Sequence, residues 1–358
     1  MSDGSKKKHS RKVGPRVTTL ADLSEHTGLS KSTVSRALSG YSDISTETKQ
    51  RVQDAAKKLG YYPSAIARSI KKGTSQSAAI ILPQGYEEAN ALATLELIEG
   101  ISNELLSRDW TLTVCSTNGL ERLSEIQRLI IQEKRVDGCI IPAPTTNDSR
   151  IEMLTEFGVP FVTYGHVDGL SSHYCDVDID GCIANSVSIL KGSGHTRIAF
   201  VGLKKSNIEP DHWLQSFHRS MSQSDLAMVP GFQSACGSNM QETKQFARVL
   251  LSSKNPPTAF LCASDAAAFG VYAACRELEI LVGDQVSVVG FGNHRMIDCL
   301  SPGLTSYSVN YRRSGAQLAN LLMEHIQNTE APKKRKHLEK AVLVRRDSIG
   351  FPALGSRG

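Results

Sequence analysis

Short apolar runs alternate with longer segments of helical character from Ala78 onward, and this alternation constrains the fold more than any other feature of the chain. It predicts parallel β-sheets with helices on both faces. Seven apolar runs are too many for one small sheet, so we expect two doubly wound subdomains with a ligand crevice at the carboxyl ends of their strands. The runs expected to form strands are residues 78–83, 111–116, 137–143, 160–165, 197–202, 258–263 and 286–291.

The segment from Met1 to Ser75 differs from the rest of the chain in charge. It carries 15 Lys and Arg against 6 Asp and Glu, a balance of +9, which leaves −4 for the remainder of a chain with net charge +5. A basic segment attached to a slightly acidic body is typical of a nucleic-acid-binding module joined to another domain. A basic, disordered tail is the alternative, and it fits only residues 1–16, because regular helical patterning follows them.

Three short helices are predicted in this basic segment, each opened by a capping side chain and closed by a glycine. A tight turn separates the first two, with the spacing of a helix-turn-helix. Between Leu29 and Leu38, Val34 and Ala37 recur at helical spacing, whereas hydroxyls and cations cover the other face. Such a helix can contact a large, flat, anionic partner, and DNA is the first candidate. The expected caps are Thr19 with Asp22, Ser30 and Ser45 at the starts, and Gly28, Gly40 and Gly60 at the ends.

Several other classes of protein lack support in the sequence. No run is long enough to span a bilayer, and the basic start lacks the apolar segment of a secretory signal, so we expect a cytoplasmic protein without a membrane partner. Without GxSxG, GxxxxGK[ST] or HExxH, no enzyme, metal or cofactor is expected, and His173 and His195 are interpreted as turn or surface residues. Reduced, mostly buried thiols are expected, with a redox sensor as the alternative, because no CxxC pair occurs among Cys115, Cys139, Cys175, Cys182, Cys236, Cys262, Cys275 and Cys299.

The order of these parts resembles that of the LacI/GalR family of bacterial transcription repressors, from residue 17 to about residue 350. The basic segment matches through TVSRAL at 33–38, an S-x-x-T-x-x-x-V pattern beginning at Ser45, and GY-x-P at 60–63. The resemblance implies an N-terminal all-α helix-turn-helix headpiece and an α/β periplasmic-binding-protein-like core of two doubly wound subdomains. Further family-like blocks lie at 191–202, 256–291 and 300–323.

The resemblance and the change in charge divide the chain into five segments. We expect the core to sense a small molecule and to provide the dimer contacts, in part through residues 266–278. The expected segments are a basic, disordered tail at 1–16, the DNA-binding headpiece at 17–62, the hinge helix and linker at 63–76, the effector-binding and dimerisation core at 77–350 with crossovers near 175 and 307, and a tail at 351–358.

The resemblance also implies which side chains of the second helix contact DNA. Lys31 and Ser32 match positions that read base edges, and Arg36 can donate two hydrogen bonds to guanine, with a phosphate contact as the alternative. The hydroxyls of Thr33 and Ser35 are expected to hold phosphates, which sets register rather than sequence. The remaining expected contacts of the headpiece and hinge are Thr19, Tyr61 and Ser64.

Residues 63–72 are interpreted as the family's hinge. Their helical pattern covers about eight residues and is too short to be stable alone in water, so we expect helix formation only on DNA. Ala67 and Ile70 match positions that face the minor groove, and isoleucine is a stiffer wedge than the usual leucine. Asp43 stands where many relatives have a neutral or basic DNA-facing residue, and it is a candidate to lie off the DNA altogether.

The expected effector site departs from the family's pattern at two charged positions. Gly292 stands where many relatives have an aspartate that binds a sugar hydroxyl, and Trp213 stands where an arginine is common. We therefore expect a neutral mono- or disaccharide, held partly by stacking on Trp213, with simple space filling by the indole as the alternative. Asp265 is expected to contact the ligand, to cap a helix, or both. The expected effector-binding residues are Gln84, Tyr86, Tyr164, His166, Trp213, Asp265, Phe291 and Asn293.

These expectations combine into a homodimeric bacterial repressor of the nucleoid. Its affinity for pseudo-palindromic, double-stranded operator DNA is expected to be controlled by a small-molecule effector, through a shift in subdomain closure. A cytoplasmic sugar-binding protein without regulatory DNA binding is the alternative. The assembly is expected to stop at a dimer, because the eight residues FPALGSRG after position 350 cannot form a leucine-heptad tail.

Overall fold

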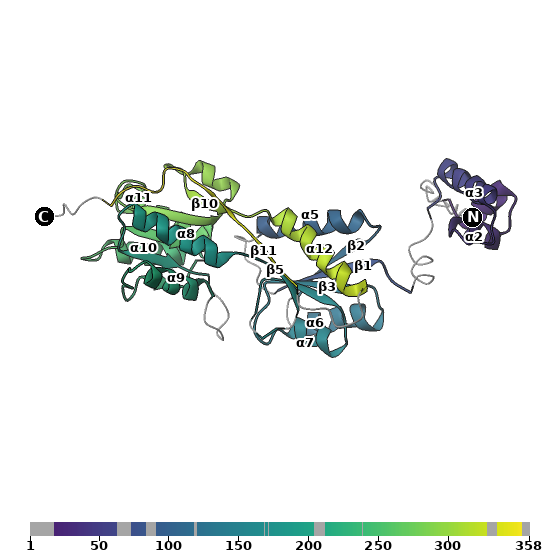
Figure 1. Cartoon of the computed structure of the whole chain (residues 1–358), viewed down its shortest axis with the longest axis horizontal. Coiled ribbons are helices and arrows are strands. Elements are labelled where there is room, and N and C mark those ends of the chain that lie inside the picture. Colours follow the sequence, from purple (N-terminus) through teal and green to yellow (C-terminus); the bar gives the residue numbers. More distant parts are fainter. Residues whose placement is uncertain are drawn as a thin grey trace, which may run out of the picture. The chain divides into compact units, whose positions relative to one another are not determined.

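The computed structural model describes residues 18–62, 73–83, 91–117, 120–167, 169–170, 172–203, 212–237, 239–327 and 335–352. It divides into two compact units, residues 1–75 and residues 76–358 (Figure 1). The predicted hinge helix lies outside the described residues, together with five of the expected site residues. These five are Ser64, Ala67, Ile70, Gln84 and Tyr86.

The first unit contains the three predicted helices, and their starts have local chemical causes. Each is opened by a hydroxyl that accepts a hydrogen bond from the first turn, as predicted: Thr19 for α1 (Leu20–Thr27), Ser30 for α2 (Lys31–Leu38) and Ser45 for α3 (Thr46–Leu59). Asp22 completes a capping box with Thr19. Gly28 and Gly60 end α1 and α3 in the left-handed conformation, in which a side chain would be strained.

A small apolar core joins these helices. Leu23 of α1, Val34 and Ala37 of α2 and Val52 of α3 are fully buried, and Ala55 and Ala56 are nearly so. Burial of a whole valine or leucine side chain is worth about 1.5–3 kcal/mol, so this core holds α2 firmly against the other two helices. The predicted packing residues of α2 are thereby confirmed.

The second unit contains two six-stranded sheets among its described residues. In the first sheet all strands are parallel, in the order β11-β5-β4-β3-β1-β2. Helices α5 (Ala91–Leu106) and α12 (Tyr311–Gln327) pack on one face, and α6 (Leu120–Gln127), η2 (Arg128–Gln132) and α7 (Ser149–Glu156) pack on the other. Its strands are β1 (Ser77–Leu82), β2 (Thr111–Ser116), β3 (Gly138–Pro142), β4 (Phe161–Tyr164), β5 (His173–Val177) and β11 (Lys336–Glu339).

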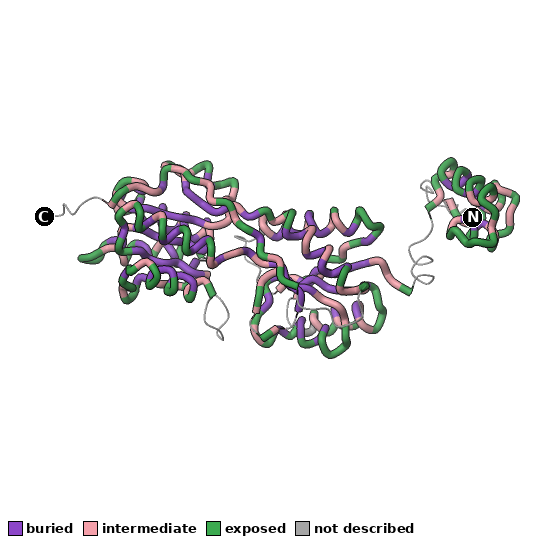
Figure 2. The backbone as a smooth tube through the Cα atoms, viewed as in Figure 1, coloured by how far each residue is buried: buried purple, intermediate pink, exposed green. Residues whose placement is uncertain are grey.

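The second sheet has the order β12-β10-β9-β8-β6-β7 and is parallel except for the pairing of β12 with β10. Helices α8 (Ile179–Gly192) and α9 (His212–Gln223) cover one face, and α10 (Met240–Leu251) and α11 (Asp265–Glu277) cover the other. Figure 2 shows buried strands flanked by helices whose outer faces are exposed. The remaining elements are β6 (Ile198–Val201), β7 (Gln233–Ser234), β8 (Ala259–Cys262), β9 (Ser287–Gly292), β10 (Thr305–Ser308), β12 (Val342–Val344) and the short helix η3 (Arg295–Cys299).

The chain passes between the two subdomains at three points within the described residues. It crosses from β5 to α8, from β10 to α12, and from β11 to β12. Crossings near residues 175 and 307 were predicted from the sequence, and the third was not. In Figure 1 the third crossing is the yellow segment that runs from β11 toward β10. Because of the second crossing, α12, which follows β10 of the second sheet, packs on α5 and on the first sheet.

All seven predicted strands are confirmed, but two predictions about histidines are wrong. His173 lies in β5 and His195 precedes β6, and both are buried rather than in exposed turns. His195 is 1% exposed and contacts Thr258 Oγ1 at 3.0 Å, Ser287 Oγ at 2.8 Å and the carbonyl of Gly350 at 3.0 Å. Burial lowers the pKa of His195 below its ordinary value.

The expectation of mostly buried thiols is confirmed, with Cys299 exposed and Cys115 half-buried.

Candidate DNA-binding and effector sites

The outward face of α2 is polar because its apolar residues are held in the headpiece core. Lys31, Ser32, Ser35 and Arg36 are exposed, and Thr33 is half-buried. The helix repeat places these side chains opposite Val34 and Ala37. The face therefore presents two cations and three hydroxyls to solvent, which is the chemistry that phosphates and base edges require.

Hydroxyl groups at the start of α2 are organised around the cap residue. Ser30 Oγ lies 2.8 Å from Ser32 Oγ and 2.9 Å from Thr33 Oγ1, and it accepts a hydrogen bond from the Thr33 amide at 3.1 Å. These contacts limit the rotamers of Ser32 and Thr33 before any ligand binds. A base edge or phosphate would thus meet hydroxyls that are already positioned.

Two other expected DNA contacts have structural roles in the headpiece. The Thr19 hydroxyl donates to Asp22 Oδ2 at 2.7 Å, and the Thr19 amide donates to the same oxygen at 2.8 Å. Tyr61 packs against the headpiece core, and burial raises the pKa of its phenol. Both side chains stabilise the unit that carries α2, whether or not they also contact DNA.

Arg36 is held by two residues of the loop that follows α2. Its Nη2 forms an ion pair and hydrogen bond with Oδ2 of Asp43. Its guanidinium carbon lies 5.4 Å from the centre of the Tyr41 ring, within range of a cation–π interaction. Arg36 and Asp43 remain about half exposed, with side-chain exposures of 50% and 47%. The guanidinium therefore has a preferred position on the exposed face of α2.

Aromatic side chains lie together at the carboxyl end of β9. Trp213, at the start of α9, contacts Phe291 edge to face, and Phe291 in turn lies 6.1 Å from the ring of Tyr307. Trp213 and Phe291 are both partly exposed. The structure thus brings together two of the predicted effector-binding residues from different elements.

Asp265 organises the loop after β9, and the prediction that it caps a helix is wrong. The cap of α11 is Ser264, whose hydroxyl accepts from Ala267 N, so Asp265 occupies the first helical position. Its Oδ1 accepts from Ser306 Oγ at 2.6 Å, and its Oδ2 accepts from the His294 amide at 2.6 Å. The carboxylate is 4% exposed, and burial raises its pKa despite these hydrogen bonds.

The first subdomain contributes Tyr164 at the end of β4 and His166 two residues beyond it. Tyr164 contacts Tyr311 at the start of α12, with ring centres 6.5 Å apart, and burial raises the pKa of its phenol. The His166 ring stacks on Tyr174 at 4.5 Å, and its amide donates to Asp176 Oδ2 at 3.0 Å. Because Tyr311 also packs against the core of the second subdomain, the Tyr164–Tyr311 contact lies where the two subdomains meet.

Two family models match the chain in the same order as these two units. The model described as "Bacterial regulatory proteins, lacI family" matches residues 19–64, and the one described as "Periplasmic binding protein-like domain" matches residues 187–349. The chain therefore carries a lacI-family regulatory domain at residues 19–64.

Relatives of this chain are similar to it over nearly their whole length. The transcriptional repressor PurR of Vibrio vulnificus is 25% identical over 332 residues, which cover 92% of this chain and 98% of PurR. The transcriptional regulator AglR of Rhizobium meliloti is 27% identical over 344 residues, which cover 92% of this chain and 94% of AglR. The predicted function, a DNA-binding transcriptional regulator, is thereby confirmed.

Solved structures confirm the predicted fold class. The Lac repressor dimer bound to operator and the anti-inducer ONPF has a TM-score of 0.77 at 23% identity, and the similarity covers 93% of this chain and 99% of that one. A complex of the transcriptional regulator CelR with cellobiose has a TM-score of 0.69 at 22% identity, covering 92% and 99%. Both similarities extend over nearly the whole chain and so support the fold described above.

Two arginines that no sequence pattern singles out fix loops beside the strand ends. Arg346 donates to Asn293 Oδ1 at 3.0 Å and to the Leu304 carbonyl at 2.9 Å, so Asn293 already has one protein partner. Arg150 is buried, bonds Asp148 and donates to the Ile81 carbonyl at 2.8 Å. Burial raises the pKa of Asp148, but the hydrogen bonds and charge of Arg150 outweigh burial and lower it overall. No local motif signals either contact.

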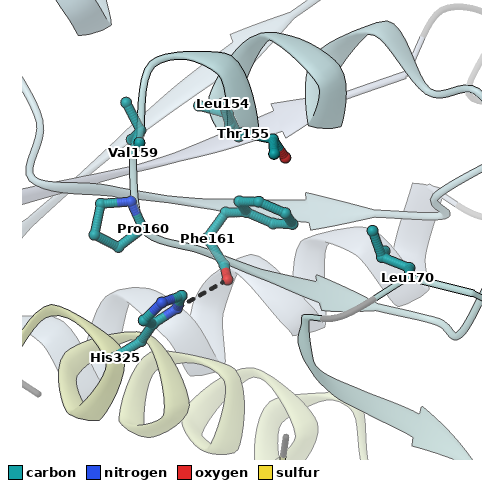
Figure 3. A pocket seen from close by; sticks show the side chains of 8 residues that line it. Leu154, Thr155, Val159, Pro160, Phe161, Leu170 and His325 are labelled. Atoms are coloured by element: carbon teal, nitrogen blue, oxygen red, sulfur yellow. Dashed lines mark hydrogen bonds between the residues drawn. The ribbon is translucent and has the colours of Figure 1, made fainter. Parts of the chain in front are cut away.

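Figure 3 shows an apolar hollow on the first subdomain, whose lining includes none of the expected effector residues. It is formed where α7 leads into β4, and Nδ1 of His325 donates to the Phe161 carbonyl there at 3.2 Å. This is the amino end of β4, whereas Tyr164 ends that strand. The residues lining the hollow are Leu154, Thr155, Gly158, Val159, Pro160, Phe161, Leu170 and His325.

Within the described residues, no group of three or more His, Cys, Asp or Glu is placed to hold a metal ion. Among the described helices, none is long and apolar enough to cross a membrane.

Proposed function

We propose that this protein is a homodimeric repressor that binds pseudo-palindromic operator DNA in the bacterial cytoplasm and whose operator affinity is set by a neutral mono- or disaccharide. The single observation that carries the DNA half of the proposal is the exposed polar face of α2 above a buried apolar stripe. The effector half rests on the Trp213–Phe291 pair beside a glycine at position 292. No cofactor and no membrane partner are part of the proposal.

In the proposed DNA complex, α2 enters the major groove. Lys31 and Ser32, at its first turn, read base edges, and Arg36 donates to guanine O6 and N7. Ser35 holds a phosphate and so fixes the register of the helix on the duplex. The balance of +9 between Met1 and Ser75 supplies sequence-independent attraction to the duplex. The proposed headpiece spans residues 17–62, and residues 63–76 form the hinge and linker.

In the proposed effector site, the sugar lies at the carboxyl ends of the strands, between the two subdomains. An apolar C–H face of the sugar stacks on Trp213, and Phe291 supports the indole from its edge. Tyr164 and His166 supply polar groups from the other subdomain. Asp265 holds the loop that carries Asn293 through the two hydrogen bonds that it accepts, and at 4% exposed it has little surface left for contact with the sugar. The CelR–cellobiose complex, a fold relative, supports a saccharide as the class to test first.

Coupling between the sites follows from the crossings. Three connections join the subdomains, so ligand binding between them changes their closure rather than the packing inside each sheet. We propose that closure alters the spacing of the two headpieces in the dimer, and that the ligand acts by favouring one of two closure states. The core, residues 77–350 with α11, provides the dimer contacts, and the assembly is a dimer.

The test is a titration of the full chain into fluorescent duplexes from the DNA around its own gene, with and without a panel of neutral mono- and disaccharides. We expect one duplex to bind at least a hundredfold more tightly than a scrambled duplex of equal composition, since specific and non-specific binding commonly differ by more. One sugar should change that affinity. Sugar binding without preference for any duplex would favour the alternative, a sugar-binding protein without regulatory DNA binding.

A further inference from the structure

The contact between Arg36 and Asp43 sets this headpiece apart from a simple basic DNA-binding surface. Asp43 lies in the loop between α2 and α3, seven residues after Arg36, and its carboxylate holds the guanidinium from the side. Tyr41, in the same loop, provides an aromatic face next to the guanidinium. Three side chains from two segments therefore form one unit at the exposed edge of α2, here called the arginine clamp: Arg36, Tyr41 and Asp43.

A carboxylate in this place has an electrostatic cost for DNA binding. Asp43 is half exposed, so its charge repels phosphates, and its ion pair with Arg36 cancels most of the attraction that this arginine would otherwise exert on the backbone. A phosphate contact therefore becomes weaker for Arg36. Hydrogen bonding to a base edge depends on direction more than on net charge, and it is much less affected.

The clamp leaves Arg36 able to contact guanine. An arginine guanidinium has five N–H donors, and Asp43 uses Nη2. The donors that remain include a pair suited to the two acceptors of guanine, O6 and N7. The ring of Tyr41 and the carboxylate of Asp43 limit the rotation of a long side chain that would otherwise lose rotamer entropy on binding.

We propose that Asp43 is a specificity-determining positioning residue, which directs Arg36 away from phosphates and onto a guanine of each operator half-site. This inference rests on the proposed contact of Arg36 with a base. Asp43 thus lowers total DNA affinity and raises the ratio between specific and non-specific binding. The acidic residue, which at first sight disfavours a DNA-facing position, acts through the arginine beside it.

The experiment selects duplexes with the full-length protein from a library of randomised sites. The guanine read by Arg36 is identified as the position whose preference is lost in R36A. Affinities for the selected duplex, and for the same duplex with that G·C pair changed to A·T, are then measured for the wild type, D43N, R36A and the double variant. E47Q is the matched control, because Glu47 is an exposed acid of the same unit in the first turn of α3.

We expect D43N to reduce the ratio of affinities for the G·C and A·T duplexes by roughly tenfold. This reduction is part of the discrimination that an arginine with two hydrogen bonds to guanine supplies. D43N and E47Q should both raise affinity for unrelated DNA because each removes one negative charge, and D43N should do so more strongly because it also frees Arg36 to contact phosphates. Only D43N should lose the guanine preference, and the loss should be absent when Arg36 is already alanine. D43A is a second variant that removes the carboxylate together with its hydrogen-bonding capacity, and it should behave like D43N.

Three results would overturn the inference. The first is an unchanged guanine preference in both D43N and D43A. The second is an additive effect of D43N and R36A, since a positioning residue cannot act on an arginine that is absent. The third is a wild type that selects no sequence from the library, which would also overturn the proposed sequence-specific binding. The first two results would leave that proposed function intact.

Discussion

The indole of Trp213 stands edge-on to the ring of Phe291, with ring centres 4.8 Å apart and an angle of 86° between the planes. Because both rings are partly exposed at the end of β9, the broad face of the indole is a candidate surface for a sugar. We expect Trp213→Ala to weaken saccharide binding by about 1–3 kcal/mol, in line with loss of a stacked aromatic contact. Effector-free operator affinity should stay almost unchanged. Calorimetry with mono- and disaccharides measures the first quantity.

Controls for this prediction come from the same class of side chain. Phe157→Ala removes an exposed aromatic residue at the end of α7, and sugar affinity should not change. Unaltered sugar affinity in Trp213→Ala would show that the indole only fills space. Tight binding of phosphorylated or acidic compounds alone would contradict the neutral saccharide itself.

The cap of α2 should control the stability of the recognition surface. Ser30→Ala removes the hydrogen bond to the Thr33 amide and the contact with Ser32, and we expect a loss of about 1 kcal/mol in headpiece stability. Hydrogen exchange of the α2 amides should be faster by a corresponding factor. Ser42→Ala, at an exposed loop position that starts no helix, serves as the control and should leave exchange unchanged. Equal protection in both variants would mean that the core alone fixes α2.

Salt should weaken operator binding steeply. Each subunit of the proposed dimer has a balance of +9 between Met1 and Ser75, so phosphate contacts release many counterions. Between roughly 50 and 200 mM salt we expect affinity to fall by orders of magnitude. Sugar affinity, measured in the same buffers, should hardly change, because the proposed ligand is neutral. A flat dependence of DNA affinity would contradict a complex dominated by phosphates.

The buried His195 should make the second subdomain acid-sensitive. Burial lowers the pKa of His195 in the folded state below the ordinary value of about 6.5, which applies to the unfolded chain. Between these two pKa values the histidine is protonated in the unfolded chain but neutral in the folded protein. The free energy of unfolding should therefore fall as the pH drops from about 6.5 toward the lowered pKa, by at most about 1.4 kcal/mol per pH unit. Urea unfolding from pH 8 to pH 5 measures this slope.

A comparison of two histidine variants isolates that effect. His195→Gln loses hydrogen bonds to Ser287 and Gly350, so it should be less stable at pH 8, but its stability should depend less on pH. His218→Gln changes an exposed histidine of α9 and should retain the slope of the wild type. An identical slope in His195→Gln would assign the acid sensitivity to other groups.

Apart from β2, which is mostly exposed, the strands that the sequence predicts are largely buried and apolar. β8, AFLC, is fully buried between two layers of helices and shows a continuous apolar run. β10, TSYS, is also mostly buried, but its hydroxyls bond other elements and segments, so the chain there has no apolar run to detect. The edge strand β11, KHLE, is half polar because it is covered on fewer sides.

The candidate site divides in the same way between local and distant interactions. Caps such as Ser30 and the polar face of α2 follow from residues within one turn, so they could be predicted. The partners of Asp265 and Asn293 could not, because Ser306 and Arg346 lie 41 and 53 residues away along the chain and meet them only through pairing of strands. Arg36 and Asp43 are only seven residues apart, but their contact depends on the path of the loop after α2. Secondary-structure propensities do not specify that path.

The two short strands near the end of the chain affect the order in which the protein can fold during synthesis. β11 completes the edge of the first sheet and β12 completes the edge of the second, and both lie within residues 336–344. Neither subdomain can therefore acquire its full sheet until the ribosome has translated residues 336–344. The headpiece, a separate compact unit at the amino end, has all its helices long before that. A nascent chain could thus carry a folded DNA-binding unit while the part proposed to sense the effector is still incomplete.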